Sequence, residues 1–145
     1  MAIETEKFAS VPLFQNLSQQ EIMKLLKISE HRMVKHGEEI IRQGQPGDGV
    51  YVISAGAFEV LKTGTENKVL ARLEELSFFG EMSLVSDSTC AASVVCMEDG
   101  RLTKIPRKAF EKMLDEGDLT AYKVVRNMSS MLAKRLARVE EELVN

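Results

Sequence analysis

Residues 43–62, Gln-Gly-Gln-Pro-Gly-Asp-Gly-Val-Tyr-Val-Ile-Ser-Ala-Gly-Ala-Phe-Glu-Val-Leu-Lys, determine the fold class that we predict for this chain. Apolar and polar side chains alternate in short runs here, and glycine and proline separate the runs, as is typical of strands joined by turns. We expect Ala55-Gly56 to be one of these turns. Six of the nine glycines lie between positions 37 and 64. This texture continues from about Met33 to Pro106 and predicts an antiparallel barrel or jelly roll.

Helices are predicted on both sides of this region. Ser18 and Glu21 have the spacing of a capping box, and apolar residues then recur at helical intervals up to about Ser29. A short amphipathic helix is expected over residues 107–114. Asp118 is placed to cap a last helix that runs to about Leu143 without glycine or proline.

The last helix carries a heptad-like seam with alternating steps of three and four residues. Its members are Tyr122, Val125, Ser129, Leu132, Leu136, Val139 and Leu143. Such a seam predicts a homodimer formed through this helix. Packing of the same seam back on the barrel fits the pattern as well, and the sequence does not identify a downstream protein partner.

Length and composition favour one ordinary globular domain. The chain has 145 residues, of which 44% are hydrophobic and 28% charged. We divide the domain 1–145 into N-terminal helices (1–31), a β-barrel (32–106) and C-terminal helices (107–145). No apolar run approaches the ~18 residues of a membrane span, and the first residues lack the apolar stretch of a signal peptide. With a net charge of −3, the expectation is a cytoplasmic protein with no membrane or nucleic-acid attraction.

The few nucleophilic and metal-binding residues do not suggest an enzyme. Cys90 and Cys96 lie too far apart along a strand-like run for a disulfide, and neither belongs to a Cys-x-x-Cys pair. With only two histidines, no zinc or other metal site is expected, and no Ser-His-Asp set is visible. Cys90 as a redox-sensitive thiol is a weaker alternative, based on a pKa lowered by a nearby helix N-terminus.

Residues 78–94 interrupt the strand pattern with a glycine and a short run of helix formers. Gly80 at the start of a one-turn helix leaves free N–H groups at its positive end, which favours an anion. Glu81 would repel a phosphate, so it is better suited to accept a hydrogen bond from a sugar hydroxyl. A purely structural helix that crosses a barrel remains the alternative.

Several motifs resemble the cyclic nucleotide-binding domain family of the bacterial catabolite activator and the regulatory subunits of cyclic-AMP-dependent kinase. They extend over nearly the whole chain: Val11-Pro12-Leu13-Phe14, Gly37-Glu38, Gln43-Gly44-x-Pro46-Gly47-Asp48, Tyr51-x-Ile53-x-x-Gly56 and Phe79-Gly80-Glu81-Met82-Ser83-Leu84. The resemblance implies an eight-stranded antiparallel jelly-roll barrel, N-terminal helices and a long C-terminal helix. It also implies a regulatory module that binds a cyclic nucleotide and signals through that helix.

Residues 78–94 correspond to the family's phosphate-binding cassette, and the resemblance assigns roles to individual residues within it. Glu81 takes the ribose 2′-hydroxyl, and the backbone around Met82 and Ser83 faces the cyclic phosphate. By the same alignment Arg135 pairs with Glu81, although a solvated helix flank is an equal alternative. The full set expected to contact the nucleotide is Phe79, Gly80, Glu81, Met82, Ser83, Cys90, Ala91, Ala92 and Arg135.

Two departures from the family bear on the ligand and the partners. An arginine that pairs with the phosphate usually stands nine residues after the glutamate, and Cys90 occupies that place. Either binding of the usual ligand is weakened, or the pocket has changed its ligand or lost it. A domain that has lost its ligand would act as a nucleotide-independent dimerisation and interaction module. Ala91, where the family often has threonine for guanine, favours cyclic AMP over cyclic GMP. The bacterial regulators carry a DNA-binding module after the last helix, whereas this sequence ends at Asn145, so we expect no direct DNA binding.

Overall fold

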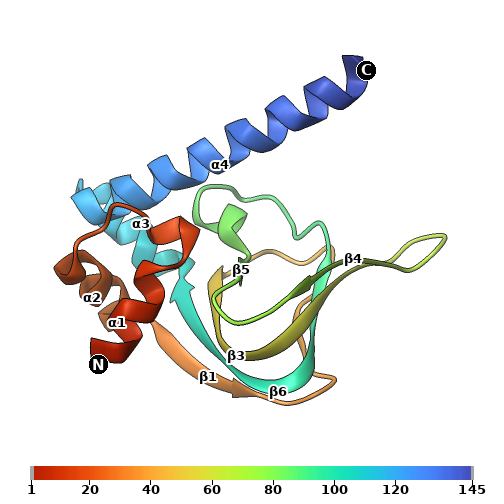
Figure 1. Cartoon of the computed structure of the whole chain (residues 1–145), viewed down its shortest axis with the longest axis horizontal. Helices are drawn as coiled ribbons and strands as arrows, with labels where there is room; N and C mark the ends of the chain where they lie inside the picture. The colour runs from red at the N-terminus through yellow and green to blue at the C-terminus, as the bar shows by residue number, and fades with distance from the viewer. Residues whose placement is uncertain (1, 145) are drawn as a thin grey trace.

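A computed structural model describes residues 2–144 of the chain; the ends of the predicted domain 1–145, Met1 and Asn145, lie outside the described residues. Helices and strands follow the order that the sequence predicts, with helices at both ends and strands between them (Figure 1). The elements are α1 (Ala2–Ala9), η1 (Pro12–Phe14), α2 (Gln19–Ile28), β1 (Glu30–Val34), β2 (Glu39–Ile41), β3 (Gly49–Lys62), β4 (Lys68–Leu73), β5 (Phe78–Phe79), η2 (Glu81–Leu84), β6 (Ser93–Pro106), α3 (Arg107–Asp115) and α4 (Leu119–Val144).

The strands form one antiparallel sheet rather than the predicted closed barrel of eight. In the described part of the chain the sheet has six strands in the order β1-β6-β3-β4, with β2 paired to β6 and β5 paired to β3. β3 and β6 have 14 residues each and pair along most of their length. The count of eight that the resemblance implied was wrong, and one reason is that β3 continues through Ala55-Gly56, where we expected a turn.

Gly56 explains the miscount. Its φ of +96° is in the left-handed region, and the β3–β6 register shifts between Ile53 and Phe58. A Cβ at Gly56 would lie 2.8 Å from Gly100 Cα on β6, so only glycine fits this close approach. Ala55-Gly56 is therefore an irregularity inside one bent strand and not the predicted turn.

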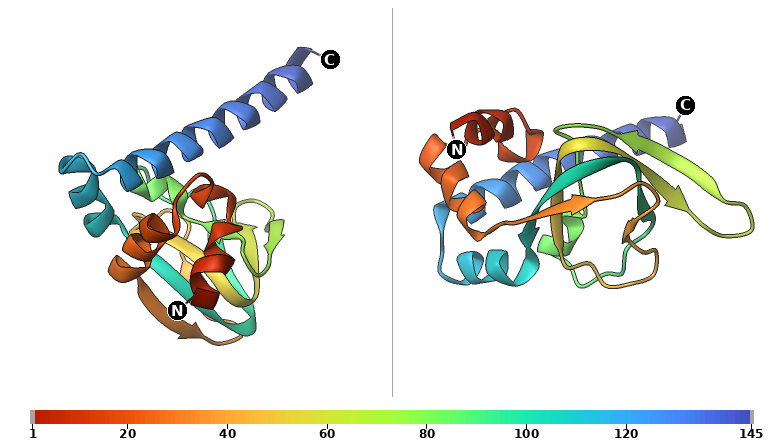
Figure 2. Two further views of the ribbon diagram at one scale, coloured as in Figure 1. Left: turned by 60° about the vertical axis from the view of Figure 1, so that its left-hand side comes forward. Right: turned by 90° about the horizontal axis from the view of Figure 1, so that it is seen from below.

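Two hydrophobic clusters hold the fold together. One joins α1, η1, α2, α3 and α4 to one face of the sheet through buried residues that include Leu13, Phe14 and Phe110. The other consists of buried side chains from β1, β2, β3, β5 and β6, among them Phe58 and Phe79. Views from other directions show the N-terminal helices, α3 and the start of α4 at one end of the strands, from which the rest of α4 extends (Figure 2).

The predicted helix caps are present. The Ser18 side chain accepts a hydrogen bond from Glu21 N, and the Glu21 carboxylate accepts one from Ser18 N, so the capping box begins α2. Asp118 accepts a hydrogen bond from Thr120 N at 2.8 Å, as predicted for the start of α4. Asn127 of α4 donates to the carbonyls of Leu13 and Gln15, which fixes the first half of this helix to η1.

The second half of α4 projects away from the rest of the molecule (Figure 1). The buried positions of α4 are Thr120, Ala121, Val124 and Met128, and every residue of 132–144 is exposed. Leu136 and Val139 of the predicted seam are 59% and 50% exposed. The distal seam therefore does not pack back on the sheet. None of the helices among residues 2–144 is both long and apolar enough for a membrane crossing.

Candidate functional site

The cassette is fixed at its start by strand pairing with β3. Phe79 pairs with Tyr51, and the two rings stack with centroids 5.1 Å apart. Gly80 follows with a φ of +81°, and a Cβ there would lie 2.7 Å from Gly49 O. Glycine is required at this position both by the backbone angle and by the close approach of the neighbouring strand. η2 begins directly afterwards, as the sequence predicts.

Ser83 and Cys90 meet at Gly47, which belongs to the turn before β3. A Cβ at Gly47 would lie 2.7 Å from Ser83 Cβ and 3.7 Å from Cys90 Sγ. Ser83 is buried, and its hydroxyl donates to Gly80 O at 2.7 Å. Ser83 and Cys90, which lie seven residues apart in the cassette, are thus brought together on a single glycine.

The last part of the cassette is joined to the turn over residues 43–46. Cys90 N donates to Gln45 O at 2.8 Å, and Cys90 O accepts from Gly44 N at 2.9 Å. Gln43 N donates to Ser93 Oγ at 2.9 Å. These bonds fix the backbone of residue 90 with its half-buried thiol beside Gly47.

Glu81 and Arg135 form the ion pair that the resemblance implies. Arg135 Nη1 lies 3.7 Å from Glu81 Oε1, and the two side chains are 59% and 17% exposed. Glu81 is therefore the sheltered partner of the pair, and Arg135 is not merely a solvated flank of the helix. The contact links the cassette to the projecting half of α4.

The remaining predicted site residues differ in their surroundings. Phe79 is buried in the core cluster of the sheet, with its ring stacked on Tyr51. Met82 is 43% exposed. Ala91 is exposed and Ala92 half-buried in the run that leads into β6. Their contact with a nucleotide stays a prediction.

Asp48, Tyr51 and Lys104 form a polar cluster that the sequence analysis missed. Lys104 Nζ donates to Asp48 Oδ2 at 2.6 Å, and the Tyr51 hydroxyl donates to Asp48 Oδ1 at 3.0 Å. Burial acts to raise the pKa of Asp48, but the hydrogen bonds from Lys104 and Tyr51 outweigh it and leave this pKa below its ordinary value. Burial, and then the Asp48 charge, raise the pKa of Tyr51. The alternation around Lys104 predicted its strand but gave no sign of a partner 56 residues away.

The Cys90 thiol is not activated. Burial, followed by the charge of Asp48, raises its pKa above the ordinary thiol value. The alternative of a redox-sensitive Cys90 with a lowered pKa is therefore wrong. Both cysteines are free thiols in the structure.

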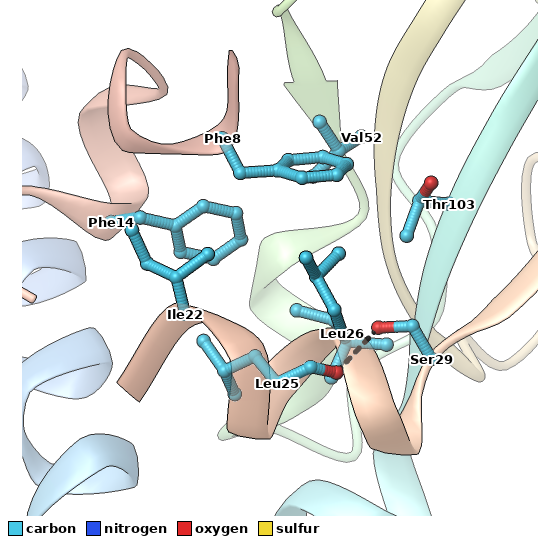
Figure 3. A pocket seen from close by; sticks show the side chains of 9 residues that line it. Phe8, Phe14, Ile22, Leu25, Leu26, Ser29, Val52 and Thr103 are labelled. Atoms are coloured by element: carbon cyan, nitrogen blue, oxygen red, sulfur yellow. Dashed lines mark hydrogen bonds between the residues drawn. The ribbon is translucent and has the colours of Figure 1, made fainter. Parts of the chain in front are cut away.

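An open pocket with a volume of about 390 Å³ adjoins this region. It is lined by residues 39–42, residues 45–48 and Cys90. A second, apolar pocket between the N-terminal helices and the sheet holds only about 10 Å³, which is room for one water molecule at most (Figure 3). The second pocket is thus a packing gap, too small for a nucleotide. The described residues contain no group of three or more His, Cys, Asp or Glu side chains that could hold a metal ion.

Comparison with known proteins agrees with this architecture. The profile of the family described as "Cyclic nucleotide-binding domain" matches residues 31–117. The "Cyclic AMP receptor protein" of Thermus thermophilus is 31% identical over 134 residues, which are 91% of this chain and 60% of that protein. A "cAMP-dependent protein kinase regulatory subunit" of Neurospora crassa is 30% identical over 104 residues, 72% of this chain and 27% of that protein.

A solved structure gives the same result. The crystal structure of the Thermus thermophilus catabolite activator protein superposes with a TM-score of 0.80 at 29% identity, covering 91% of this chain and 61% of that one. The chain belongs to the cyclic nucleotide-binding domain family. It is a cyclic nucleotide-binding regulatory domain of the type found in the catabolite activator and the kinase regulatory subunits. It spans about 60% of the length of the Thermus relative.

Proposed function

We propose that the chain senses cyclic AMP at the cassette and signals its presence through α4. The observation that carries this proposal is the Glu81–Arg135 pair, because the residue assigned to the ribose also holds the projecting helix. In this role Glu81 accepts a hydrogen bond from the 2′-hydroxyl. The backbone around Met82 and Ser83 faces the cyclic phosphate, beside Cys90.

Ligand binding and the position of α4 are coupled if the nucleotide and Arg135 compete for the Glu81 carboxylate. A nucleotide whose 2′-hydroxyl donates a hydrogen bond to Glu81 weakens or reorients the contact with Arg135. The ligand then shifts the equilibrium between helix arrangements by its differential affinity for them. Ala91 after Cys90 supports cyclic AMP over cyclic GMP as the ligand.

The exposed seam of α4 supports a homodimer as the output. Leu136 and Val139 are about half exposed in the single chain, and Leu143 is 82% exposed. A second α4 would bury these side chains in a parallel coiled coil.

A nucleotide-independent dimerisation and interaction module is the second candidate. Cys90 favours it, since a neutral thiol stands where the family's arginine pairs with phosphate. The exposed seam serves this function equally well. The two candidates differ in whether α4 responds to nucleotide.

Hydrogen exchange of α4 tests the proposal. Amide exchange is measured for residues 132–144 with and without millimolar cyclic AMP, and α2 serves as an internal reference. We expect exchange in 132–144 to change on addition of the nucleotide and exchange in α2 to stay constant. Unchanged exchange in both segments, with bound nucleotide demonstrated by titration, would contradict signalling through α4.

A further inference from the structure

A bound cyclic phosphate brings one negative charge into a site whose usual arginine is absent. A phosphate held against an uncharged wall loses hydration without compensation. The basic side chains around the cassette therefore decide how this charge is balanced. This inference rests on the proposed function.

Lys104 reaches this region from β6. Its side chain is 20% exposed, and its ammonium group lies 5.7 Å from the centroid of the Tyr51 ring. Lys104 Cε lies 3.2 Å from the position of a Cβ at Gly49, and the carbonyl of Gly49 lies 2.7 Å from that position at Gly80. The backbone of Gly49 thus lies close to both the lysine stem and Gly80 of the cassette.

Asp48 lies between Lys104 and Cys90, the residue that stands in place of the family's arginine. It follows Gly47, which touches Ser83 and Cys90, and its charge is one cause of the raised pKa of the Cys90 thiol. The Tyr51 hydroxyl also donates to Asp48, so the carboxylate does not depend on Lys104 alone. A lysine ammonium has three donors on a flexible stem and can bind a second anion while it holds Asp48.

Other basic side chains near the cassette are, like Lys104, paired with carboxylates. Arg135 pairs with Glu81, and Arg107 pairs with Asp87 and Glu111. Arg42 lines the open pocket beside Cys90, pairs with Glu39 and has a side chain that is 71% exposed. Its exposure makes it a weaker electrostatic partner than the sheltered Lys104.

We propose that Lys104 supplies the positive charge that balances the cyclic phosphate in place of the family's arginine. Lys104 lies on β6, beside Asp48, and would therefore be a binding residue outside the cassette motif. Binding should accordingly weaken as salt concentration rises.

Calorimetric titration with cyclic AMP in low-salt buffer tests this assignment on the full chain. Lys104→Met is expected to bind about 10-fold more weakly than the parent, whereas Lys104→Arg keeps the charge and stays within about threefold. Arg42→Met is the matched control and should bind as the parent does. Cys90→Arg introduced into Lys104→Met should restore the lost affinity. Thermal melting of each variant verifies that it is folded.

Each other result overturns the assignment. Parent-like affinity of Lys104→Met shows that the lysine is not used, and equal losses in Lys104→Met and Arg42→Met show a general charge effect. Binding by Cys90→Arg but not by the parent means that Lys104 does not replace the arginine, while the cassette still holds nucleotide. Absence of binding in both contradicts the proposed function itself, and the role of Lys104 with it.

Discussion

Arg135 Nη1 lies 3.7 Å from Glu81 Oε1 and joins the projecting half of α4 to the cassette. The first half of the helix is fixed elsewhere, by buried side chains and by the two hydrogen bonds of Asn127. The chain therefore holds one part of α4 firmly and the other by a partly exposed ion pair. A ligand that engages Glu81 acts on the weakly held part.

Removal of the Glu81 carboxylate should weaken nucleotide binding with little effect on the fold. Glu81→Ala is expected to lose about 1–3 kcal/mol of binding free energy, because the ribose hydroxyl is left without its acceptor. The ion pair with the exposed Arg135 contributes less than about 1 kcal/mol to stability. Glu81→Gln retains one acceptor oxygen and should lose less. Equal affinity of Glu81→Ala and the parent would place the nucleotide elsewhere.

Disruption of the α4 seam should abolish the homodimer. Leu136→Glu places a charge in the seam, so sedimentation equilibrium at tens of micromolar should give a dimer for the parent and a monomer for this variant. Leu119→Glu is the matched control, since Leu119 is 60% exposed on the same helix but outside the seam. A monomeric parent, or an unchanged mass for Leu136→Glu, would argue against this interface.

Acid should destabilise the start of α4 through Asp118. The hydrogen bond from Lys24 is the main cause that holds the pKa of Asp118 below its ordinary value, and burial opposes it. A lowered folded-state pKa means that the stabilisation is present above the unfolded pKa and is lost as the pH falls through the folded value. Asp118→Asn should therefore show a smaller loss of unfolding free energy between pH 5 and pH 2 in urea titrations. Identical pH profiles for parent and variant would contradict this role.

Alkylation of Cys90 should be slow. Burial and the Asp48 charge raise the pKa of this thiol, so less thiolate is present at pH 8 than in an ordinary cysteine. The rate of iodoacetamide labelling, followed by peptide mass spectrometry, should be lower in the folded chain than in the urea-unfolded chain. Faster labelling of the folded chain would restore the idea of an activated thiol.

The local parts of the fold could be predicted from the sequence, and the long-range parts could not. The Ser18 capping box and the Asp118 cap depend on neighbours two or three residues away, and both are present. The strand count failed because Gly56 reads as a turn residue, whereas its role is a close approach to Gly100 across the sheet. The local pattern contains no trace of that contact.

The candidate site divides in the same way. Gly80 and Glu81 are recognisable in one short motif, and the Arg135 contact followed from the family alignment. Lys104 was missed because its partner, Asp48, lies on another strand-and-turn unit 56 residues away. A lysine in an alternating strand resembles any solvated lysine until the strands are paired.

Calorimetric titration of the purified chain with cyclic AMP and cyclic GMP tests the central claim most directly. We predict saturable heat with one nucleotide per chain and tighter binding of cyclic AMP than of cyclic GMP. Absence of both heat and a thermal shift at millimolar concentrations of either nucleotide would contradict the account and leave the nucleotide-independent module.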